Sequence, residues 1–354
     1  MRVAVVAERT VHHAETDATT RTSRLASGLA ERGHEVTVFC SQWWDDDEAE
    51  MTAEVDGVTH RAVTRHPSAP DLRFAARLPR VVGEFAPDVI HARHEPPAIV
   101  LGAGTARRLA RAPLVVDWYG DDLRTDRTRR ARRLAVGTPD RVIVPSRLVE
   151  TRVRELGVPA EGVERIPDAI DMGVIRDADP ESAADIVYAR RLDDDAGLES
   201  LFLALAELRG RDWSLAVLGD GPERDAYERQ AADFRIDDRV RFLGAQPLER
   251  EIAIMKGARA AVHTAHHAPF PPEFLRALAC GCVGIAVYRA ASSAHELIET
   301  HPRGIRVSSD HQLADAIRQA AGMDHRTVEP SFSPFNMDAV LDRYLACYRD
   351  VRGD

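Results

Sequence analysis

Short apolar runs alternate with segments of helical periodicity along the first half of the chain. The runs are rich in β-branched residues and almost continuously apolar, which is typical of parallel strands buried on both faces. They lie at 2–6, 36–40, 88–91, 114–118 and 141–144. Helices are predicted between them, at 20–32, 97–111 and 147–156. This alternation predicts a doubly wound, Rossmann-like α/β domain over residues 1–168.

A hairpin is predicted within this domain. The segment Val55-Asp-Gly-Val58 places an Asp-Gly pair between two β-branched residues. Asp-Gly is a strong signal for a two-residue hairpin turn. We therefore expect a small hairpin inserted on the sheet.

The alternation pauses over the polar stretch 169–184 and then restarts. Further strands are predicted at 185–188, 214–218, 240–243, 260–264 and 283–287, each followed by a helical segment. This indicates a linker at 169–184 and a second Rossmann-like domain at 185–330. The last segment, 331–354, holds an amphipathic helix that we expect to pack back on the first domain. Since ligands bind outside the carboxyl ends of parallel strands, two such domains predict a site in the cleft between them.

Charge narrows the possible functions. The net charge is −10, and Lys256 is the only lysine, which argues against a general nucleic-acid binder. Acidic runs at 45–48 and 193–195 favour a salt-rich cytoplasm over the alternative, a GC-rich genome that favours arginine codons. The cysteines have no metal-type spacing and are expected to be buried apolar residues. Without a signal peptide or an apolar run of membrane length, an intracellular location is expected.

Two segments of the second domain are candidates for binding an anion. Arg190 and Arg191 follow the first strand of that domain and would suit a diphosphate; the alternative is a surface salt bridge to the aspartates at 193–195. Gly219, Asp220 and Gly221 lie between a strand and a helix, where glycines let a ligand approach the backbone. A plain tight turn is an equal alternative.

A third candidate is the serine-rich turn at 291–296. Ser292 and Ser293 follow a strand and precede a helix that contains His295 and Glu296. Serine hydroxyls at such a position bind a phosphate or only cap the helix, and capping is the simpler interpretation. The His–Glu pair does not by itself indicate catalysis.

The first domain offers two weaker candidates. Six arginines lie within 124–133 and would suit anionic lipid head groups or a phosphate-bearing acceptor; a solvated face balanced by Asp121, Asp122 and Asp126 is the alternative. After the first strand come four polar residues that could contact an acceptor or only form a loop, namely His12, His13, Glu15 and Asp17. No metal-ligand set, nucleophile elbow or Walker loop is present in the sequence.

Several segments resemble glycosyltransferase family 4 in order and spacing. They include Arg32-Gly-His-Glu-Val36, Pro87-Asp-Val-Ile-His91, Ile166-Pro-Asp-Ala-Ile-Asp171, Leu218-Gly-Asp-Gly-Pro222 and Ala277-Leu-Ala-Cys-Gly281. Further matches are at 1–6, 145–158 and 240–244, so that the resemblance covers roughly residues 1–320. The resemblance implies the GT-B fold, in which two Rossmann-like domains face a central cleft. The chain would be a divergent member of the family, and its composition is of a haloarchaeal type. The resemblance also implies a retaining, metal-independent transferase that uses a nucleotide-sugar as substrate and needs no cofactor.

The resemblance places the segment 266–281 on the family's donor-sugar loop. Two glutamates expected eight positions apart are replaced here by Ala268 and Arg276. Prolines at 269, 271 and 272 remove amide donors. Glu273, in the first helical turn, is expected to be ionised by the helix dipole and is the candidate catalytic residue; a plain first-turn glutamate is the alternative. Arg276 is a candidate second phosphate contact.

Other positions also depart from the family pattern. The lysine expected five residues after Arg191 is Ala196, and a histidine often found after the strand at 114–118 is Tyr119. A glycine-rich loop after the first strand is replaced by 12–20. Arg191 is therefore the charged donor-site residue that transfers cleanly from the family.

These observations lead to three hypotheses. The favoured one is a hexosyltransferase that acts on a glycan or lipid-linked acceptor at the inner face of the membrane. Its donor would be held by Arg191, Arg276, the 219–221 loop, the serine turn and Glu296. The second is a GT-B protein that no longer catalyses and serves as a binding partner in glycan assembly. The third is another GT-B reaction, such as sugar-nucleotide epimerisation.

Overall fold

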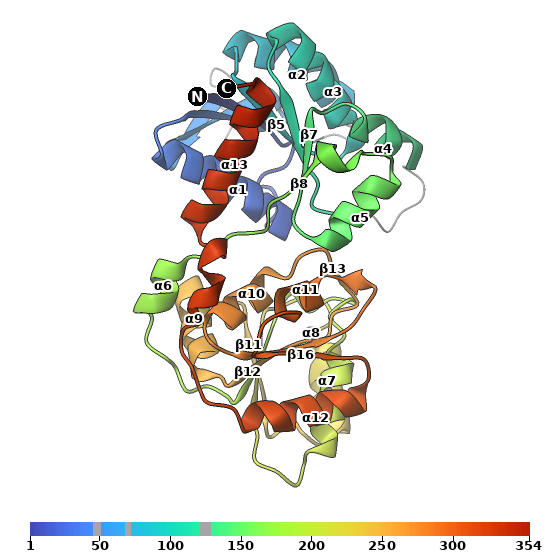
Figure 1. The fold of residues 1–354 in the computed structure, drawn as a ribbon, viewed down its shortest axis with the longest axis vertical. Helices are drawn as coiled ribbons and strands as arrows, with labels where there is room; N and C mark the ends of the chain where they lie inside the picture. Colours follow the sequence, from blue (N-terminus) through green and yellow to red (C-terminus); the bar gives the residue numbers. More distant parts are fainter. Residues whose placement is uncertain (45–50, 68–71, 121–128) are drawn as a thin grey trace. The chain divides into compact units, whose positions relative to one another are not determined.

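The computed structural model describes residues 1–44, 51–67, 72–120 and 129–354 (Figure 1). The chain forms two compact units. The first unit is made of residues 1–168 together with 337–354, and the second of residues 169–336. The segment 169–184 thus belongs to the second unit, and the C-terminal helix belongs to the first.

The first unit is built on an eight-stranded sheet of order β3-β4-β2-β1-β5-β6-β7-β8. Its neighbouring strands are parallel except β3 and β4. The strands are β1 (Arg2–Val6), β2 (Glu35–Ser41), β3 (Thr52–Val55), β4 (Val58–Thr64), β5 (Val89–Arg93), β6 (Leu114–Asp117), β7 (Arg141–Val144) and β8 (Val163–Arg165). The expected hairpin is confirmed: Asp56 and Gly57 both have positive φ, 52° and 73°, as its tight turn requires.

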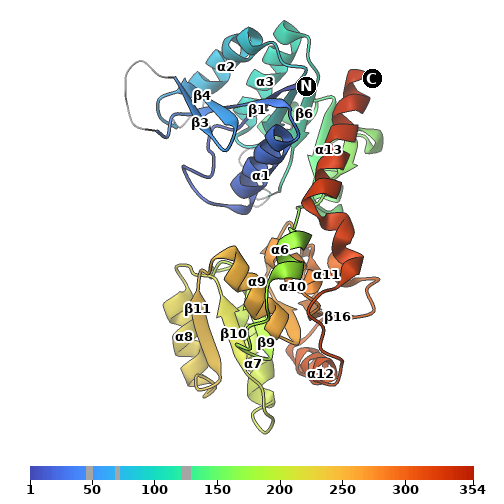
Figure 2. The ribbon, with the colours of Figure 1, turned by 90° about the vertical axis from the view of Figure 1, so that its left-hand side faces the viewer.

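Helices cover both faces of this sheet. On one face lie α2 (Leu72–Phe85), α3 (Pro97–Ala110), α4 (Arg129–Val136) and α5 (Arg147–Glu155). Their buried side chains share one core with alternate strand residues such as Val6, Ile90 and Val116. The other face carries α1 (Asp17–Glu31) and the C-terminal α13 (Met337–Arg352), which lie side by side (Figure 2). The last helix of the chain therefore completes the first unit.

The second unit is built on a six-stranded parallel sheet of order β11-β10-β9-β12-β14-β16. Its strands are β9 (Ile186–Ala189), β10 (Leu215–Leu218), β11 (Val240–Gly244), β12 (Ala260–His263), β14 (Val283–Val287) and β16 (Gly304–Val307). The two-residue strands β13 (His267–Ala268) and β15 (Ala291–Ser292) pair separately. The helices are α6 (Met172–Asp177), α7 (Leu198–Glu207), α8 (Arg224–Asp233), α9 (Leu248–Gly257), α10 (Pro272–Ala279), α11 (Ala294–Ile298) and α12 (Asp310–Ala321). The prediction of two Rossmann-like α/β domains is confirmed.

The single lysine lies inside the second unit. Lys256, near the end of α9, is only 3% exposed. Its Nζ donates to the carbonyls of Ile175 at 2.8 Å, Arg176 at 3.3 Å and Ala178. The carbonyls at the end of a short helix have no intrahelical partners. The ammonium therefore caps α6 with a charge that satisfies three of them.

Three further observations concern the described residues only. All four cysteines are buried and free, as expected. Across 1–44, 51–67, 72–120 and 129–354, no group of three His, Cys, Asp or Glu side chains is arranged to hold a metal ion. In the same part of the chain, no helix is long and apolar enough to cross a bilayer.

Candidate functional site

The carboxyl end of β9 presents two arginines that differ in environment. Arg190 donates to the carbonyls of Arg191 and His267 at 3.1 and 3.4 Å and pairs with Asp193 at 3.2 Å. It holds the loop together, as the salt-bridge interpretation expected. Arg191 is exposed, and its guanidinium makes no hydrogen bond or ion pair with a described residue. Arg191 is therefore the cation at this strand end that is available to an anionic ligand.

The structure explains why glycines follow β10. The sequence alone could not separate this explanation from ligand binding. A Cβ at Gly219 or Gly221 would clash with the carbonyl oxygens of Arg190 and Leu192, because the two loops cross in contact. Gly219 also has a φ of +110°, which favours glycine. The amide of Gly221 donates to Oδ1 of Asp220 at 2.8 Å. The tight-turn interpretation accounts for this loop, and its amides are only partly available to a ligand.

The serine turn fastens the proline-rich loop. Ser292 and Ser293 are each 1% exposed. The hydroxyl of Ser293 donates to the carbonyl of Pro269 at 2.7 Å, and its amide donates to the carbonyl of Ala268 at 2.9 Å. Ser292 Oγ lies 3.3 Å from Nε2 of His263. Both hydroxyls thus have partners within the protein, and neither is exposed as a phosphate ligand would be.

A charged cluster lies at the start of α10, beside the proline-rich loop. Arg276 is 9% exposed and donates to Oε1 of Glu251 in α9 from both Nε and Nη2, at 3.0 and 2.8 Å. Its Nη2 also lies 3.7 Å from Oε1 of Glu273. Two carboxylates therefore share one guanidinium. The sequence interpretation did not include Glu251, because nothing in the local pattern of α9 distinguishes it from a solvated helical glutamate.

This environment shifts the pKa of Glu273. Burial is the main reason that its pKa is raised, and the neighbouring Glu251 adds to the effect while Arg276 opposes it. Burial and Glu251 thus act against the effect that was expected from the helix dipole. For Arg276, a contact with a donor phosphate would compete with its pair to Glu251. Glu296, in α11, is partly buried and has other interactions.

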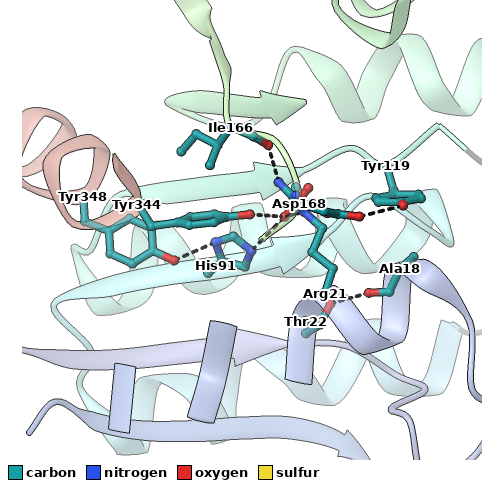
Figure 3. Close-up of polar contacts among 10 residues, drawn as sticks. Ala18, Arg21, Thr22, His91, Tyr119, Ile166, Asp168, Tyr344 and Tyr348 are labelled. Carbon is teal, nitrogen blue, oxygen red and sulfur yellow. Dashed lines mark hydrogen bonds and ion pairs between the residues drawn. The ribbon is translucent and has the colours of Figure 1, made fainter. Parts of the chain in front are cut away.

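The first unit contains a buried polar network that the sequence interpretation missed (Figure 3). Arg21 in α1 is 7% exposed and pairs with Asp117 at 2.8 Å and with Asp168 at 2.5 Å. It also donates to the carbonyl of Ile166 at 2.7 Å. Tyr119, the residue at the family's histidine position, donates its hydroxyl to Asp168 at 2.9 Å. One guanidinium thus joins α1, the end of β6 and the segment after β8.

The C-terminal helix completes the network. Tyr344 donates its hydroxyl to Asp117 Oδ2 at 2.9 Å, and the hydroxyl of Tyr348 lies 2.9 Å from Nδ1 of His91 (Figure 3). Burial would raise the pKa of Asp117, but Arg21, together with the neighbouring His91 and the hydrogen bond from Tyr344, outweighs it and holds that pKa below its usual value. Burial lowers the pKa of His91 to about 4, with Arg21 acting in the same direction and Asp117 opposing. Arg21 and Asp117 are therefore charged at neutral pH, and His91 is neutral.

The weaker candidates of the first unit have local structural partners. His12 stacks on Trp43 with ring centroids 3.8 Å apart, and the amide of Thr10 donates to Nδ1 of His13 at 3.1 Å. Glu15 is exposed before α1, and Asp17 is the first residue of that helix. Residues 124–128 of the arginine segment lie outside the described residues, as do Asp121, Asp122 and Asp126. Arg130 and Arg133, in α4, are exposed.

Comparison with solved structures defines the class. A glycosyltransferase from Rickettsia africae superposes with a TM-score of 0.79 at 15% identity, over 99% of this chain and 98% of that chain. Anabaena HepE in complex with UDP superposes with a TM-score of 0.78 at 18% identity, over 99% and 100%. The two Rossmann-like units thus have the GT-B fold of glycosyltransferases.

Family models and relatives identify the family. The model of Glycosyltransferase Family 4 matches residues 18–173, and that of Glycosyl transferases group 1 matches residues 176–326. A GDP-mannose-dependent α-(1-6)-phosphatidylinositol monomannoside mannosyltransferase of Mycolicibacterium smegmatis is 28% identical over 62% of this chain and 61% of its own length. The N-acetyl-α-D-glucosaminyl L-malate synthase of Bacillus anthracis is 22% identical over 94% and 93%. The chain belongs to glycosyltransferase family 4.

Proposed function

We propose that this glycosyltransferase moves a hexosyl group from a nucleotide-sugar to a glycan or lipid-linked acceptor, with retention at the anomeric carbon and without a metal ion. The names of relatives support the donor class. The mycobacterial relative is GDP-mannose-dependent, and Anabaena HepE was solved with UDP and with UDP-glucose. The structural observation that carries the proposal is the exposed Arg191 at the carboxyl end of β9, whose side chain has no partner among the described residues.

Arg191 would neutralise the diphosphate. As the bond between the sugar and the diphosphate breaks, negative charge builds up on the leaving group. A guanidinium stabilises this charge through forked, charge-assisted hydrogen bonds, without the need for a metal. Arg190 already binds Asp193 and two carbonyls. Arg191 is therefore the arginine that would contact the diphosphate.

Glu273 would contact the sugar at the other side of the donor. Its raised pKa favours a carboxyl that can donate a hydrogen bond to a sugar hydroxyl as well as accept one. Arg276 and Glu251 would hold it in place through the shared guanidinium. The proline-rich loop offers few amides, so side chains would take over contacts that backbone N–H groups supply elsewhere.

Titration calorimetry with UDP, GDP and their sugar conjugates tests the proposal. We expect one nucleotide family to bind, and Arg191→Ala to weaken that binding roughly 10- to 100-fold, the loss expected for charge-assisted hydrogen bonds. Arg229→Ala is the matched control, because Arg229 is an exposed arginine of α8 whose side chain has no partner among the described residues. The control should bind as the unmodified protein does. If the Arg191→Ala variant binds the nucleotide as tightly as the unmodified protein does, Arg191 does not contact the donor.

A second function is favoured by one specific observation. Arg276 stands where the family has a glutamate, and it is already paired with Glu251. A protein with this arrangement could have given up catalysis and act as a binding partner in glycan assembly. Failure of every nucleotide and nucleotide-sugar to bind the folded protein would favour that role over transfer.

A further inference from the structure

Three neighbouring helices of the first unit are unusually basic. The helices α2, α3 and α4 pack in order along one face of the sheet (Figure 1). Together they hold nine arginines and one acidic residue, Glu84. The chain as a whole has a net charge of −10. Positive charge is thus concentrated on one helical layer of an otherwise acidic protein.

The arginines point outward because the apolar positions of these helices face the sheet. In α2, Phe74, Leu78 and Val82 recur every four residues and are fully buried. The opposite side of the same helices is exposed. It carries Arg73, Arg77, Arg80, Arg108, Arg130 and Arg133, with Arg111 at the end of α3. The basic side chains therefore form the solvent face of the layer.

Leucines share this solvent face. Leu72 is 61% exposed, Leu101 41%, Leu109 66% and Leu134 68%. Seven large apolar side chains are exposed among the described residues of the chain, and these four belong to the three helices. Leu101, Arg108 and Leu109 share one side of α3, since they are separated by seven and eight residues. We call this surface, with its exposed arginines and four leucines, the arginine–leucine face.

Among the described residues, one ion pair compensates the exposed arginines of this face. Arg80 pairs with Glu84 at 3.2 Å in a solvent-exposed bridge. The guanidinium groups of the other six exposed arginines make no hydrogen bond or ion pair with a described residue; these are Arg73, Arg77, Arg108, Arg111, Arg130 and Arg133. The exposed leucines gain free energy when they leave water, and the arginines beside them attract anions. A partner that is both anionic and apolar therefore fits this face.

We propose that the arginine–leucine face docks on the surface of an anionic lipid bilayer. Guanidinium groups would contact lipid phosphates, while the leucines enter the boundary between head groups and acyl chains, as in interfacial amphipathic helices. Nucleic acid would satisfy the arginines but offers nothing for four exposed leucines. The inference rests on the helix surface alone and does not depend on the proposed transfer reaction. It extends the expected contact at 124–133 to three helices, α4 among them.

Vesicle flotation tests this inference. The full-length protein is mixed with phosphatidylglycerol vesicles or with phosphatidylcholine vesicles, at a KCl concentration where circular dichroism shows it folded. We expect flotation with the anionic vesicles only. Since each arginine near an anionic surface changes the partition coefficient roughly fivefold, Arg77→Ser, Arg108→Ser and Arg133→Ser together should lower it about 100-fold. Leu109→Ser with Leu134→Ser should also lower it.

The control uses the same residue types on the second unit. Leu203 of α7 is 41% exposed and Arg229 of α8 is exposed, and Leu203→Ser with Arg229→Ser should leave flotation unchanged. Equal flotation with both lipids, or no effect of either set of substitutions, overturns the inference. So does tight binding of duplex DNA that competes with the vesicles and is unaffected by the leucine substitutions, because that result assigns the face to nucleic acid.

Discussion

At the scale of single residues, Lys256 shows how a buried charge is tolerated. Its ammonium is almost fully enclosed, yet it donates to three carbonyl oxygens around the end of α6. Removing the donor would leave these oxygens buried without a partner. The cost of a lost hydrogen bond is greatest when the remaining group cannot reach water.

Lys256→Met is expected to lower the free energy of unfolding by about 2 kcal/mol, because methionine keeps the volume and removes the donors. Urea denaturation followed by the fluorescence of Trp213, the tryptophan of the second unit, measures this. Lys256→Arg keeps the charge and should cost less. A change below about 0.5 kcal/mol for the methionine variant would contradict the capping role.

Residue chemistry was only partly predictable from the sequence. The position after a strand pointed to Arg190 and Arg191 together, and the family resemblance singled out Arg191. The roles of Arg190, Gly219 and Gly221 could not be separated from ligand binding, since the crossing of two loops decides them and these loops are distant in sequence. Glu251 and Arg21 look like ordinary helical charges until the fold brings their partners to them.

At the scale of elements, the C-terminal helix α13 is attached to its unit by two kinds of polar contact. One is buried: Tyr344 binds Asp117, and Tyr348 binds His91. The other is on the surface, where Arg32 pairs with Asp338 at 2.9 Å and Asp342 at 2.6 Å. Buried hydrogen bonds, above all the one from Tyr344 to the charged Asp117, are stronger than exposed ion pairs. The tyrosines should therefore dominate the attachment.

The double variant Tyr344→Phe with Tyr348→Phe is expected to lower the free energy of unfolding of the first unit by about 2–4 kcal/mol. It should also speed hydrogen exchange in α13, because that helix loses its buried anchors. The matched control, Arg32→Ala, should cost less than about 1 kcal/mol. Hydrogen exchange read by mass spectrometry, together with denaturation, distinguishes the two. A larger effect of Arg32→Ala would reverse the ranking.

Elements were predicted well where burial makes the pattern strong. The strands β1, β7 and β14 have the expected bounds, because each is a continuous apolar run inside a parallel sheet. The short edge strands β8 and β16 were not predicted. Both lie at the rim of a sheet and are only partly buried, so their composition carries little periodic signal. Helix α2 was also missed, and Pro79 lies inside it.

At the scale of the whole molecule, each unit contains a buried, neutral histidine. His91 in the first unit has a pKa lowered to about 4, mainly by burial. His263 in the second has a pKa lowered to about 3 by burial, with Arg190 adding to the effect. The unfolded chain titrates both near 6.5. Between these values the unfolded state binds more protons than the folded state, so stability rises with pH.

The contribution of these histidines to the free energy of unfolding is therefore expected to be fully present above pH 6.5. It should decrease as the pH drops toward 4. For His91 the difference of about 2.5 pH units corresponds to a loss of order 3 kcal/mol at most. Denaturation at a series of pH values measures it. His91→Gln should make the free energy of unfolding of the first unit less dependent on pH, although the variant is less stable at pH 7. If the free energy of unfolding of this variant depends on pH as strongly as that of the unmodified protein, His91 does not cause the pH dependence.

The burial of the only lysine also determines how fast the protein reacts with amine-reactive reagents. Acylating reagents and lysine-directed cross-linkers attack an accessible, unprotonated ε-amine, and the single ε-amine here lies beneath the end of α6. The folded second unit thus offers these reagents no lysine. Acylation of Lys256 can proceed only as fast as α6 and α9 separate, so the rate of labelling records how often this part of the protein opens.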